Sequence, residues 1–265
     1  MKEIQKSLGK PSEILSNISG YKVYYYRTAP STNDIAKKIA RQTPEDRFVI
    51  FSETQSCGRG RRGRHWISPK GGLWFSIVMR PHMDPKDVLK LTFIASLAVA
   101  KTIKALFSVT TEVKWPNDVL VNHKKVCGIL TEASVRKDSV SLAVIGVGVN
   151  ANIDLQAFPT HLQESATSLR HELGCEVDRM ALMERILQDF LRYYSKLRKG
   201  LWKQLLNEWK GKASFFGKDI KITGSGGIVE GKALDINEDG ALIIEANDGT
   251  TKEIVTGDLV VTSRS

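Results

Sequence analysis

Residues 118–149 read DVLVNHKKVCGILTEASVRKDSVSLAVIGVGV and contain three runs of β-forming residues. The runs lie near 118–121, 126–135 and 140–149, and the segments between them, Asn-His-Lys and Arg-Lys-Asp, are polar and turn-like. Connections this short join antiparallel neighbours. The stretch therefore predicts a three-stranded antiparallel meander.

Upstream of this meander, the sequence alternates between β-like and helix-like segments. Residues 21–27 (YKVYYYR) predict a strand, and the following STND at 31–34 has a serine and an aspartate at capping-box spacing before a helix. Residues 48–54 and 73–79 predict two strands that flank an arginine-rich loop. An Asp-Pro pair then begins a pattern over 84–107 that predicts a long, mostly buried helix.

Downstream of the meander, the pattern changes from helical to all-β. Residues 178–197 and 201–210 predict two helices, the first clearly amphipathic. From about 211 the chain consists of short alternating runs broken by glycines, which is typical of a small β-barrel. We therefore expect an α+β domain over 1–210 followed by a β domain over 211–265, with only about twenty residues before the first strand.

Composition limits the class of protein. The 265 residues are 42% hydrophobic and 26% charged, without an apolar run long enough for a membrane span, and the N-terminus does not resemble a secretory signal. A cytoplasmic protein with no membrane contact is expected. Cys57, Cys127 and Cys175 are far apart and odd in number, which favours reduced thiols. The net charge of +10 indicates an anionic partner.

The arginine-rich loop, GRGRRGR at 58–64, matches the pattern G-x-G-x-x-G. A dinucleotide-binding loop with this pattern must open a helix, because the helix N-terminus binds the pyrophosphate. Here WISP at 66–69 follows, which is a poor helix start, and the chain has neither kinase motifs nor a Walker A sequence. The glycine pattern therefore does not predict a dinucleotide or kinase loop.

Three interpretations of the loop stay open from its residues alone. Four guanidinium groups on a glycine-rich backbone can fold over a phosphate ligand, and the empty loop should be mobile because like charges repel. Arginine and glycine clusters also bind nucleic-acid backbones. The third interpretation is a solvated, charged surface loop.

Two further segments carry charge or glycine in unusual places. KWPND at 114–118 and KVCGIL at 125–130 bracket one hairpin, and a lysine beside a glycine-containing strand can reach a carboxylate and a phosphate. Lys125 can equally be a solvated hairpin lysine, and Asp118 either a turn residue or a metal ligand. GVGVN at 146–150 leaves one face without side chains, for close sheet packing or for a flat ligand.

Taken together, these segments resemble the biotin protein ligases, also called biotin–acetyl-CoA-carboxylase ligases. The resemblance covers nearly the whole chain and rests on motifs in the family's order and spacing: STND at 31–34, ETQSCGRGRRGRHW at 53–66, KWPNDV at 114–119, KVCGIL at 125–130 and GVGVN at 146–150. It implies a class II synthetase-like biotin/lipoate ligase catalytic domain, with a mixed or antiparallel central sheet, and a small SH3-like β-barrel.

The resemblance also implies a two-step reaction. Biotin and MgATP give biotinoyl-5′-AMP and pyrophosphate, and a lysine of a biotin carboxyl carrier protein then attacks the mixed anhydride. The implied substrates are biotin and ATP, with Mg²⁺ and no tightly bound cofactor, and a homodimer is left open. Bifunctional members carry an N-terminal helix-turn-helix domain, for which the residues before the first predicted strand are too few, so no operator DNA is expected.

Residue roles follow from the same resemblance. Lys125 is expected to be the main electrostatic catalyst and Arg61 to clamp the intermediate, while Asp118 is the expected Mg²⁺ ligand and 152–169 the adenylate-side loop. The residues assigned to biotin are Ser31, Thr32, Asn33, Gln55, Gly58, Arg59, Lys125, Gly128 and Gly148. The residues assigned to ATP and the adenylate are Arg59, Arg61, Arg62, Arg64, Trp66, Lys114, Asn117 and Asn150.

Two alternatives remain at this point. Lipoate protein ligases share the fold and the adenylation step but lack the arginine loop and KWPND. A nucleic-acid-binding protein would use the arginine loop and the β-barrel, with strongly salt-dependent affinity.

Overall fold

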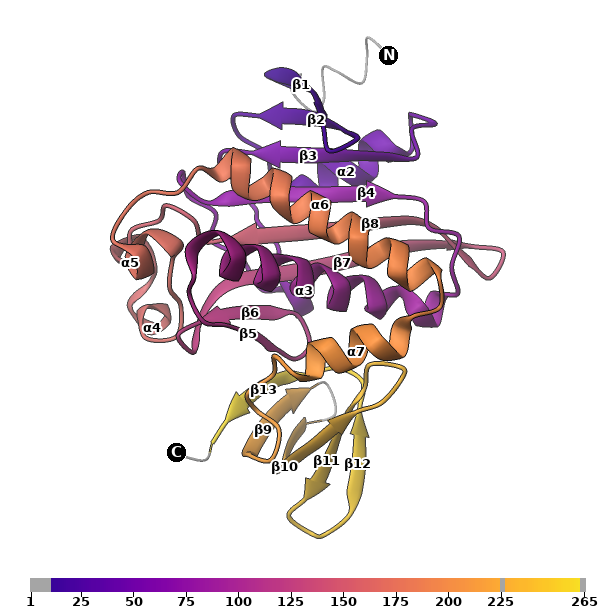
Figure 1. Ribbon diagram of the computed structural model, residues 1–265, viewed down its shortest axis with the longest axis vertical. Coiled ribbons are helices and arrows are strands. Elements are labelled where there is room, and N and C mark those ends of the chain that lie inside the picture. The colour runs from indigo at the N-terminus through magenta and orange to yellow at the C-terminus, as the bar shows by residue number, and fades with distance from the viewer. Residues whose placement is uncertain (1–10, 225–226, 263–265) are drawn as a thin grey trace.

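The structure is a computed structural model and describes residues 11–224 and 227–262 (Figure 1). The larger sheet has eight strands: β1 (Glu13–Ile18), β2 (Tyr21–Tyr26), β3 (Arg47–Ser52), β4 (Leu73–Met79), β5 (Thr111–Lys114), β6 (Asp118–Val121), β7 (Lys124–Arg136) and β8 (Ser139–Val149). The α-helices are α2 (Thr32–Ala40), α3 (Val88–Phe107), α4 (Thr160–Gln163), α5 (Leu169–Leu173), α6 (Arg179–Arg198) and α7 (Trp202–Lys210). The C-terminal sheet contains β9 (Asp219–Gly224), β10 (Gly227–Ile236), β11 (Leu242–Ala246), β12 (Thr251–Ile254) and β13 (Asp258–Val261).

The eight strands follow the order β1-β2-β3-β4-β8-β7-β6-β5, and the β2–β3 pair is parallel while the other pairs are antiparallel. The predicted meander is confirmed as β6, β7 and β8. Its turns are two residues long rather than three, because Asn122-His123 and Lys137-Asp138 all adopt positive φ, which matches the twist of the paired strands. The expected α+β fold with a mixed sheet is thus confirmed.

Two strands were missed from the sequence. The strand β1 begins at Glu13 and pairs with β2, so the prediction of about twenty residues before the first strand was wrong. The strand β5 covers Thr111–Lys114 and pairs with β6, which makes 115–117 a hairpin turn. Both strands are short and lie at the edges of the sheet, where only one neighbour constrains the pattern.

The predicted helices are confirmed with small shifts at their ends. The long helix begins with a 3₁₀ turn, Pro85–Asp87, because the Asp84 side chain accepts a hydrogen bond from the Lys86 backbone, and α3 follows. Asp178 caps α6 through the backbone N–H groups of Met180 and Ala181. The expected domain boundary at 210/211 falls between α7 and β9 and stays a prediction.

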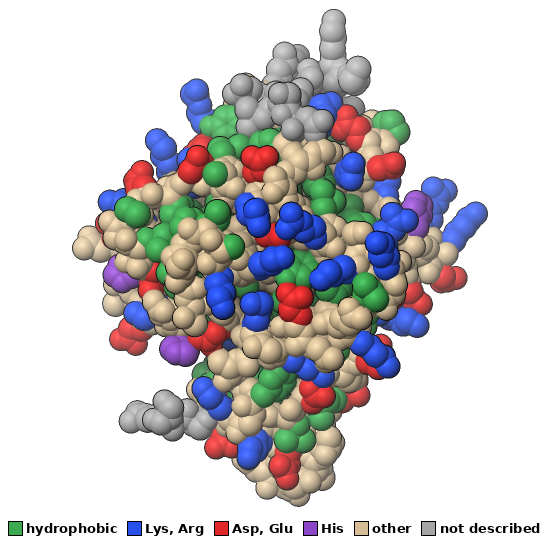
Figure 2. Space-filling model, in the orientation of Figure 1, with side chains coloured by type: hydrophobic (Ala, Val, Ile, Leu, Met, Phe, Trp, Pro, Cys, Tyr) green, Lys and Arg blue, Asp and Glu red, His purple; other side chains and the backbone are tan. Residues whose placement is uncertain are grey.

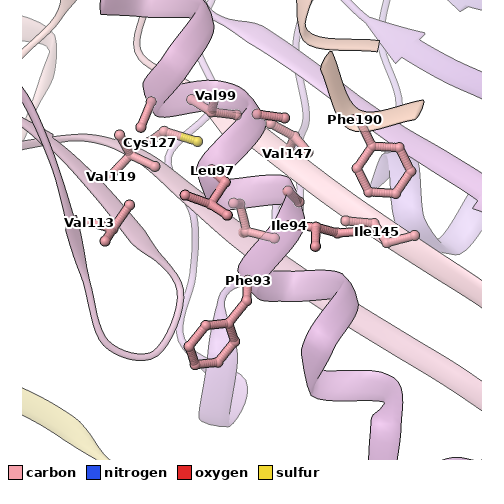
Figure 3. Packing of buried hydrophobic residues seen from close by; sticks show 14 of the residues in the cluster. Phe93, Ile94, Leu97, Val99, Val113, Val119, Cys127, Ile145, Val147 and Phe190 are labelled. Atoms are coloured by element: carbon pink, nitrogen blue, oxygen red, sulfur yellow. The ribbon is translucent and has the colours of Figure 1, made fainter. Parts of the chain in front are cut away.

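Helices cover both faces of the large sheet. The helices α3 and α6 lie on the face turned toward the viewer in Figure 1. Buried side chains of α3, among them Phe93, Ile94 and Leu97, pack there against strand residues such as Ile145 and Val147 (Figure 3). The helix α2 packs on β3, β4 and β8 with a separate cluster of buried side chains. Although α3 is long, no helix in the described ranges is long and apolar enough to cross a membrane.

Tryptophans join α3 and α7 to the C-terminal sheet. The Phe93 ring lies 5.7 Å from that of Trp202 and 4.7 Å from that of Trp209, measured between centroids. The indole of Trp115 donates to the Gly240 carbonyl at 3.0 Å, and that of Trp202 donates to the backbone carbonyl of Glu238 at 2.7 Å. The loop between β10 and β11 is therefore fixed against the larger part of the molecule.

Replacing Phe93 by alanine should destabilise the whole chain, because its ring is fully buried at this junction. We expect the free energy of unfolding to fall by about 3–5 kcal/mol, measured by urea denaturation. Leu106→Ala, on the same helix with a side chain that is 45% exposed, serves as the control and should cost no more than about 0.5 kcal/mol. Equal losses for the two variants would contradict the packing argument.

Positive charge gathers on the face that α3 and α6 cover (Figure 2). Asp189 of α6 is fully buried and accepts a hydrogen bond from Thr102 at 3.1 Å. Three cations pair with the same carboxylate: Lys101 at 3.4 Å and Arg185 and Arg192 at 3.3 Å. Because three cations share one carboxylate, this face keeps an excess of positive charge, so the arginine loop is not the sole source of the basic composition.

The three cysteines are unpaired, as expected. Cys57 and Cys175 are exposed, whereas Cys127 is buried in β7. Burial raises the pKa of the Cys127 thiol far above its usual range, so this thiol stays protonated and packs as a small apolar group.

Candidate functional site

A pocket opens between the start of α2, the arginine loop, strands β7 and β8, and the loop that follows β8. Most of the residues predicted from the sequence line it: Ser31, Thr32, Asn33, Gln55, Arg59, Arg61, Arg64, Trp66, Asn117, Lys125, Gly128, Gly148 and Asn150. Four of them lie outside this lining: Gly58, Arg62, Lys114 and Asp118. Lining residues that had no individual predicted role include Phe75, Ile129, Leu130, Gly146 and Val147, and the expected adenylate-side loop (152–169) contributes Phe158, Leu162, Ser165 and Ala166.

One end of the pocket is a network of buried hydrogen bonds. Gln55 Oε1 accepts from the backbone N–H of Thr32 at 2.8 Å and from its hydroxyl at 3.1 Å. The Ser76 hydroxyl lies 2.7 Å from Thr32 Oγ1 and 2.6 Å from Asn33 Oδ1. Side chains fixed in this way present donors and acceptors in set directions, which suits recognition of a polar ring.

Ser31 precedes α2 but does not form the predicted capping box. It is the N-cap residue by position, yet its side chain makes no capping hydrogen bond. Ser31 is buried and lines the pocket instead, and Asp34 pairs with Lys37 and Arg59. The serine and aspartate of the STND motif thus serve the pocket and its rim rather than the helix end.

One wall of the pocket is formed by glycines and therefore has no side chains. Gly128 and Gly148 are paired on neighbouring strands, and the Trp66 ring lies over both. A Cβ added to Gly148 would lie 2.6 Å from Trp66 Nε1, and one added to Gly128 would lie 2.9 Å from the same ring. A Cβ on Gly146 would come within 2.4 Å of Asn33. The alternating glycines therefore make room for the Trp66 ring and the Asn33 amide of the chain itself, and their role as a surface for a flat ligand stays a prediction.

Two buried polar atoms at this wall have no hydrogen-bond partner: Trp66 Nε1, a donor, and Asn150 Oδ1, an acceptor. Buried polar groups are usually paired, so each of these two atoms is free to bond with a water molecule or with a polar ligand in the pocket.

Lys125 reaches into the pocket from β7. Its Nζ lies 2.7 Å from Asp118 Oδ1 and 5.1 Å from the centre of the Trp66 ring. Lys125 is therefore a pocket residue and not a solvated hairpin lysine. The Asp118 carboxylate is its counter-ion, and the part of the chain that the structure describes contains no cluster of three or more His, Cys, Asp or Glu side chains suited to a metal ion.

The arginine loop connects β3 to β4, as predicted. Arg59 pairs with Asp34 at 3.0 Å and with Glu132 at 2.6 Å, at the pocket rim. Arg61 donates to Asn117 Oδ1 at 3.2 Å and to Thr256 Oγ1 at 2.8 Å, and burial lowers the pKa of its guanidinium. Arg61 therefore stands between the pocket and the C-terminal sheet.

The other two arginines contact the C-terminal sheet. Arg62 donates to the Thr223 carbonyl at 2.6 Å and pairs with Asp258 at 3.4 Å, and Arg64 pairs with the same carboxylate. Each guanidinium of the loop has an oxygen partner, so the expected mutual repulsion is offset by acceptors that the sequence analysis did not identify. No motif singles out Asp258, because it is one aspartate in a short β-segment far along the chain.

Lys114 and Gly58 are two of the predicted residues that do not line the pocket. Lys114 lies at the end of β5, and burial lowers the pKa of its ammonium group. A Cβ on Gly58 would come 2.3 Å from the Trp66 carbonyl, so glycine at 58 allows the loop to fold back on itself.

The chain resembles two family models and several known proteins. Residues 24–150 match the Biotin/lipoate A/B protein ligase family, and 215–261 match the Biotin protein ligase C terminal domain. The chain is 34% identical to the biotin–[acetyl-CoA-carboxylase] ligase of Paracoccus denitrificans over 83% of its own length and 92% of the relative's. It is 32% identical to the bifunctional ligase/repressor of Bacillus subtilis (strain 168), over 96% and 80%.

A solved structure supports the same grouping. The biotin protein ligase from Aquifex aeolicus in complex with biotin and ATP superposes with a TM-score of 0.77 at 26% identity, over 91% of this chain and 99% of that one. The expected folds of both parts of the chain agree with this likeness.

Proposed function

The chain belongs to the biotin protein ligase family, and from this premise we propose that it activates biotin as biotinoyl-5′-AMP and transfers the biotinoyl group to a lysine of a biotin carboxyl carrier domain. One observation supports this most strongly. A single pocket combines a glycine wall, a fixed polar network and the ammonium group of Lys125. Such a site can bind a flat polar ring at one end and a carboxylate at the other.

In the first step, a biotin carboxylate oxygen attacks the α-phosphorus of ATP, and the bond to pyrophosphate breaks. Negative charge approaches negative charge, so nearby cations lower the barrier. Lys125 supplies a point charge where the carboxylate and the phosphate meet. To do so, its ammonium group gives up its contact with Asp118 and contacts the substrates instead. Arg61 supplies a second cation at the pocket edge, beside Asn117.

In the second step, the amine of the acceptor lysine attacks the acyl carbon of the mixed anhydride, and AMP leaves. The intermediate must be kept from water until the acceptor arrives. Trp66, Phe158 and Leu162 provide the apolar cover, since Phe158 is buried with Trp74 and Ile153 in a cluster against which the other two pack.

ATP normally binds as its Mg²⁺ complex, and Mg²⁺ is usually held by one or two carboxylates together with substrate phosphates. Asp118 presents a carboxylate next to Lys125, so it is the residue that would hold the ion. The ion would neutralise charge on the phosphates.

The test is incubation with ATP and radiolabelled biotin, with and without a carrier domain that contains its target lysine. We expect biotin-dependent exchange of pyrophosphate into ATP without the carrier, and label on the carrier only when it is present. Lipoate in place of biotin is the specificity control. Exchange with lipoate but not with biotin would overturn the proposal.

Arg61→Gly should loosen the hold on the adenylate, because one guanidinium contact is lost. We expect biotinoyl-AMP to leave the enzyme at least about tenfold faster and to label lysines of a bystander protein such as albumin, which is measured by blotting for biotin. Arg62→Gly is the matched control, since its guanidinium contacts Thr223 and Asp258 outside the pocket lining. Equal leakage from the two variants would count against a clamp at position 61.

A further inference from the structure

The loop over the pocket, residues 158–167 (the pocket loop), is hydrogen-bonded to the strand that carries Lys125. The Lys125 backbone N–H donates to the Ser165 carbonyl at 2.9 Å, and the Thr167 N–H donates to the Lys125 carbonyl at 2.9 Å. Together they form a short parallel bridge centred on Ala166. Because Ser165 and Ala166 line the pocket, a shift of the loop would move both the pocket wall and the backbone of Lys125.

A single carboxylate, that of Glu172, connects the pocket loop to the hairpin before Lys125 a second time. Glu172, a half-buried residue of α5, accepts a hydrogen bond from Thr167 Oγ1 at 2.5 Å and another from Asn122 Nδ2 at 2.5 Å. Thr167 is fully buried at the end of the pocket loop. Asn122 is the first turn residue of the hairpin that leads into Lys125, with φ +49°. Glu172 thus holds the pocket loop and the lysine hairpin at once.

We propose that Glu172 is a positioning residue: its carboxylate sets the distance between the pocket loop (158–167) and the Lys125 hairpin, and thereby the nucleotide side of the pocket. This inference rests on the proposed ligase function and assigns Glu172 no contact with substrate. Hydrogen bonds to a charged carboxylate are among the stronger ones in proteins. Their loss would leave the Thr167 hydroxyl buried and unpaired, so the loop would favour other positions.

The biotin end of the pocket should not respond to this change. Thr32, Gln55 and Ser76 are held by one another on α2, the β3–β4 connection and β4, and none of them contacts the pocket loop through a hydrogen bond among the described residues. A positioning role for Glu172 therefore predicts that its loss raises the KM for ATP but leaves the Kd for biotin unchanged. A purely structural role, such as stabilising the first turn of α5, predicts lower stability without this difference between the two substrates.

The test compares Glu172→Ala with Glu172→Gln. For Glu172→Ala we expect the KM for ATP to rise about tenfold in biotin-dependent pyrophosphate exchange, with the Kd for biotin within about twofold of wild type by calorimetry. Glu172→Gln should stay near wild type, because its amide oxygen can accept from Asn122 and its amide nitrogen can donate to Thr167 Oγ1. Glu176→Ala is the matched control, since Glu176 is exposed and pairs only loosely with Arg170, at 3.8 Å.

Hydrogen exchange supplies a readout that does not depend on activity. Glu172→Ala should speed exchange in both 158–168 and 122–126, whereas Glu176→Ala should speed neither. Faster exchange in the loop alone, or equal changes in the KM for ATP and the Kd for biotin, would overturn the positioning role. A wild-type chain without any biotin-dependent exchange of pyrophosphate would instead refute the proposed function, and the coupling of the two segments would still be decided by hydrogen exchange.

Discussion

Lys125→Ala should slow formation of biotinoyl-AMP by about 10²–10³-fold, while transfer from supplied biotinoyl-AMP to the carrier slows far less. The reason is the charge that each step develops. Activation brings a carboxylate against a triphosphate, and the Lys125 ammonium in the pocket would offset that repulsion, whereas transfer starts from a neutral amine and the mixed anhydride. Single-turnover assays of the two steps measure the difference.

Lys124→Ala provides the matched control for this prediction. Lys124 is the preceding residue of the same strand, and successive side chains of a strand point to opposite faces, so it does not line the pocket. Its replacement should leave both steps within about twofold of wild type. Equal slowing of activation and transfer in Lys125→Ala would contradict the role given to this lysine.

Gly148→Val should weaken biotin binding by about a hundredfold, which corresponds to ~2.7 kcal/mol. The expected cause is steric, because the Cβ of the new valine already falls 2.6 Å from Trp66 Nε1 and its two methyl groups extend further into the pocket. The backbone should tolerate the change, since Gly148 lies in β8 without positive φ and valine is a good strand former. Calorimetric titration with biotin measures the loss.

Ser141→Val, near the other end of β8, separates occlusion of the pocket from damage to the strand. It should keep wild-type affinity for biotin, and both variants should keep a cooperative thermal transition. If Gly148→Val binds biotin as tightly as wild type, the glycine wall is not the biotin site.

Several features followed from local patterns. The meander β6–β8, the long helix α3 and the amphipathic helix α6 were predicted because their hydrophobic periodicity extends over many residues. The edge strands β1 and β5 were missed, because four to six residues with one neighbour leave little periodicity to detect. The capping box at Ser31 was wrong because the spacing of two residues does not say whether their side chains serve the helix or the pocket.

The pocket itself was predicted in part. The motif residues converge there because the start of β7, the end of β8 and the loop after β3 lie at the same place. Phe158, Leu162 and Glu172 could not be assigned from their residue types, since apolar residues and a single glutamate occur throughout any globular chain. Their roles come from contacts across tens of residues, such as that between Glu172 and Asn122.

The sequence by itself determined the types of structure in the two parts of the chain and the chemistry available to it, because periodicity, glycine spacing and the positions of cations are local properties. Only the tertiary structure decided between the open interpretations. It placed Lys125 in a pocket rather than in solvent, and it gave Arg62 and Arg64 a partner in Asp258, nearly two hundred residues away along the chain. Which charges meet depends on how distant strands pack, and no local pattern encodes that.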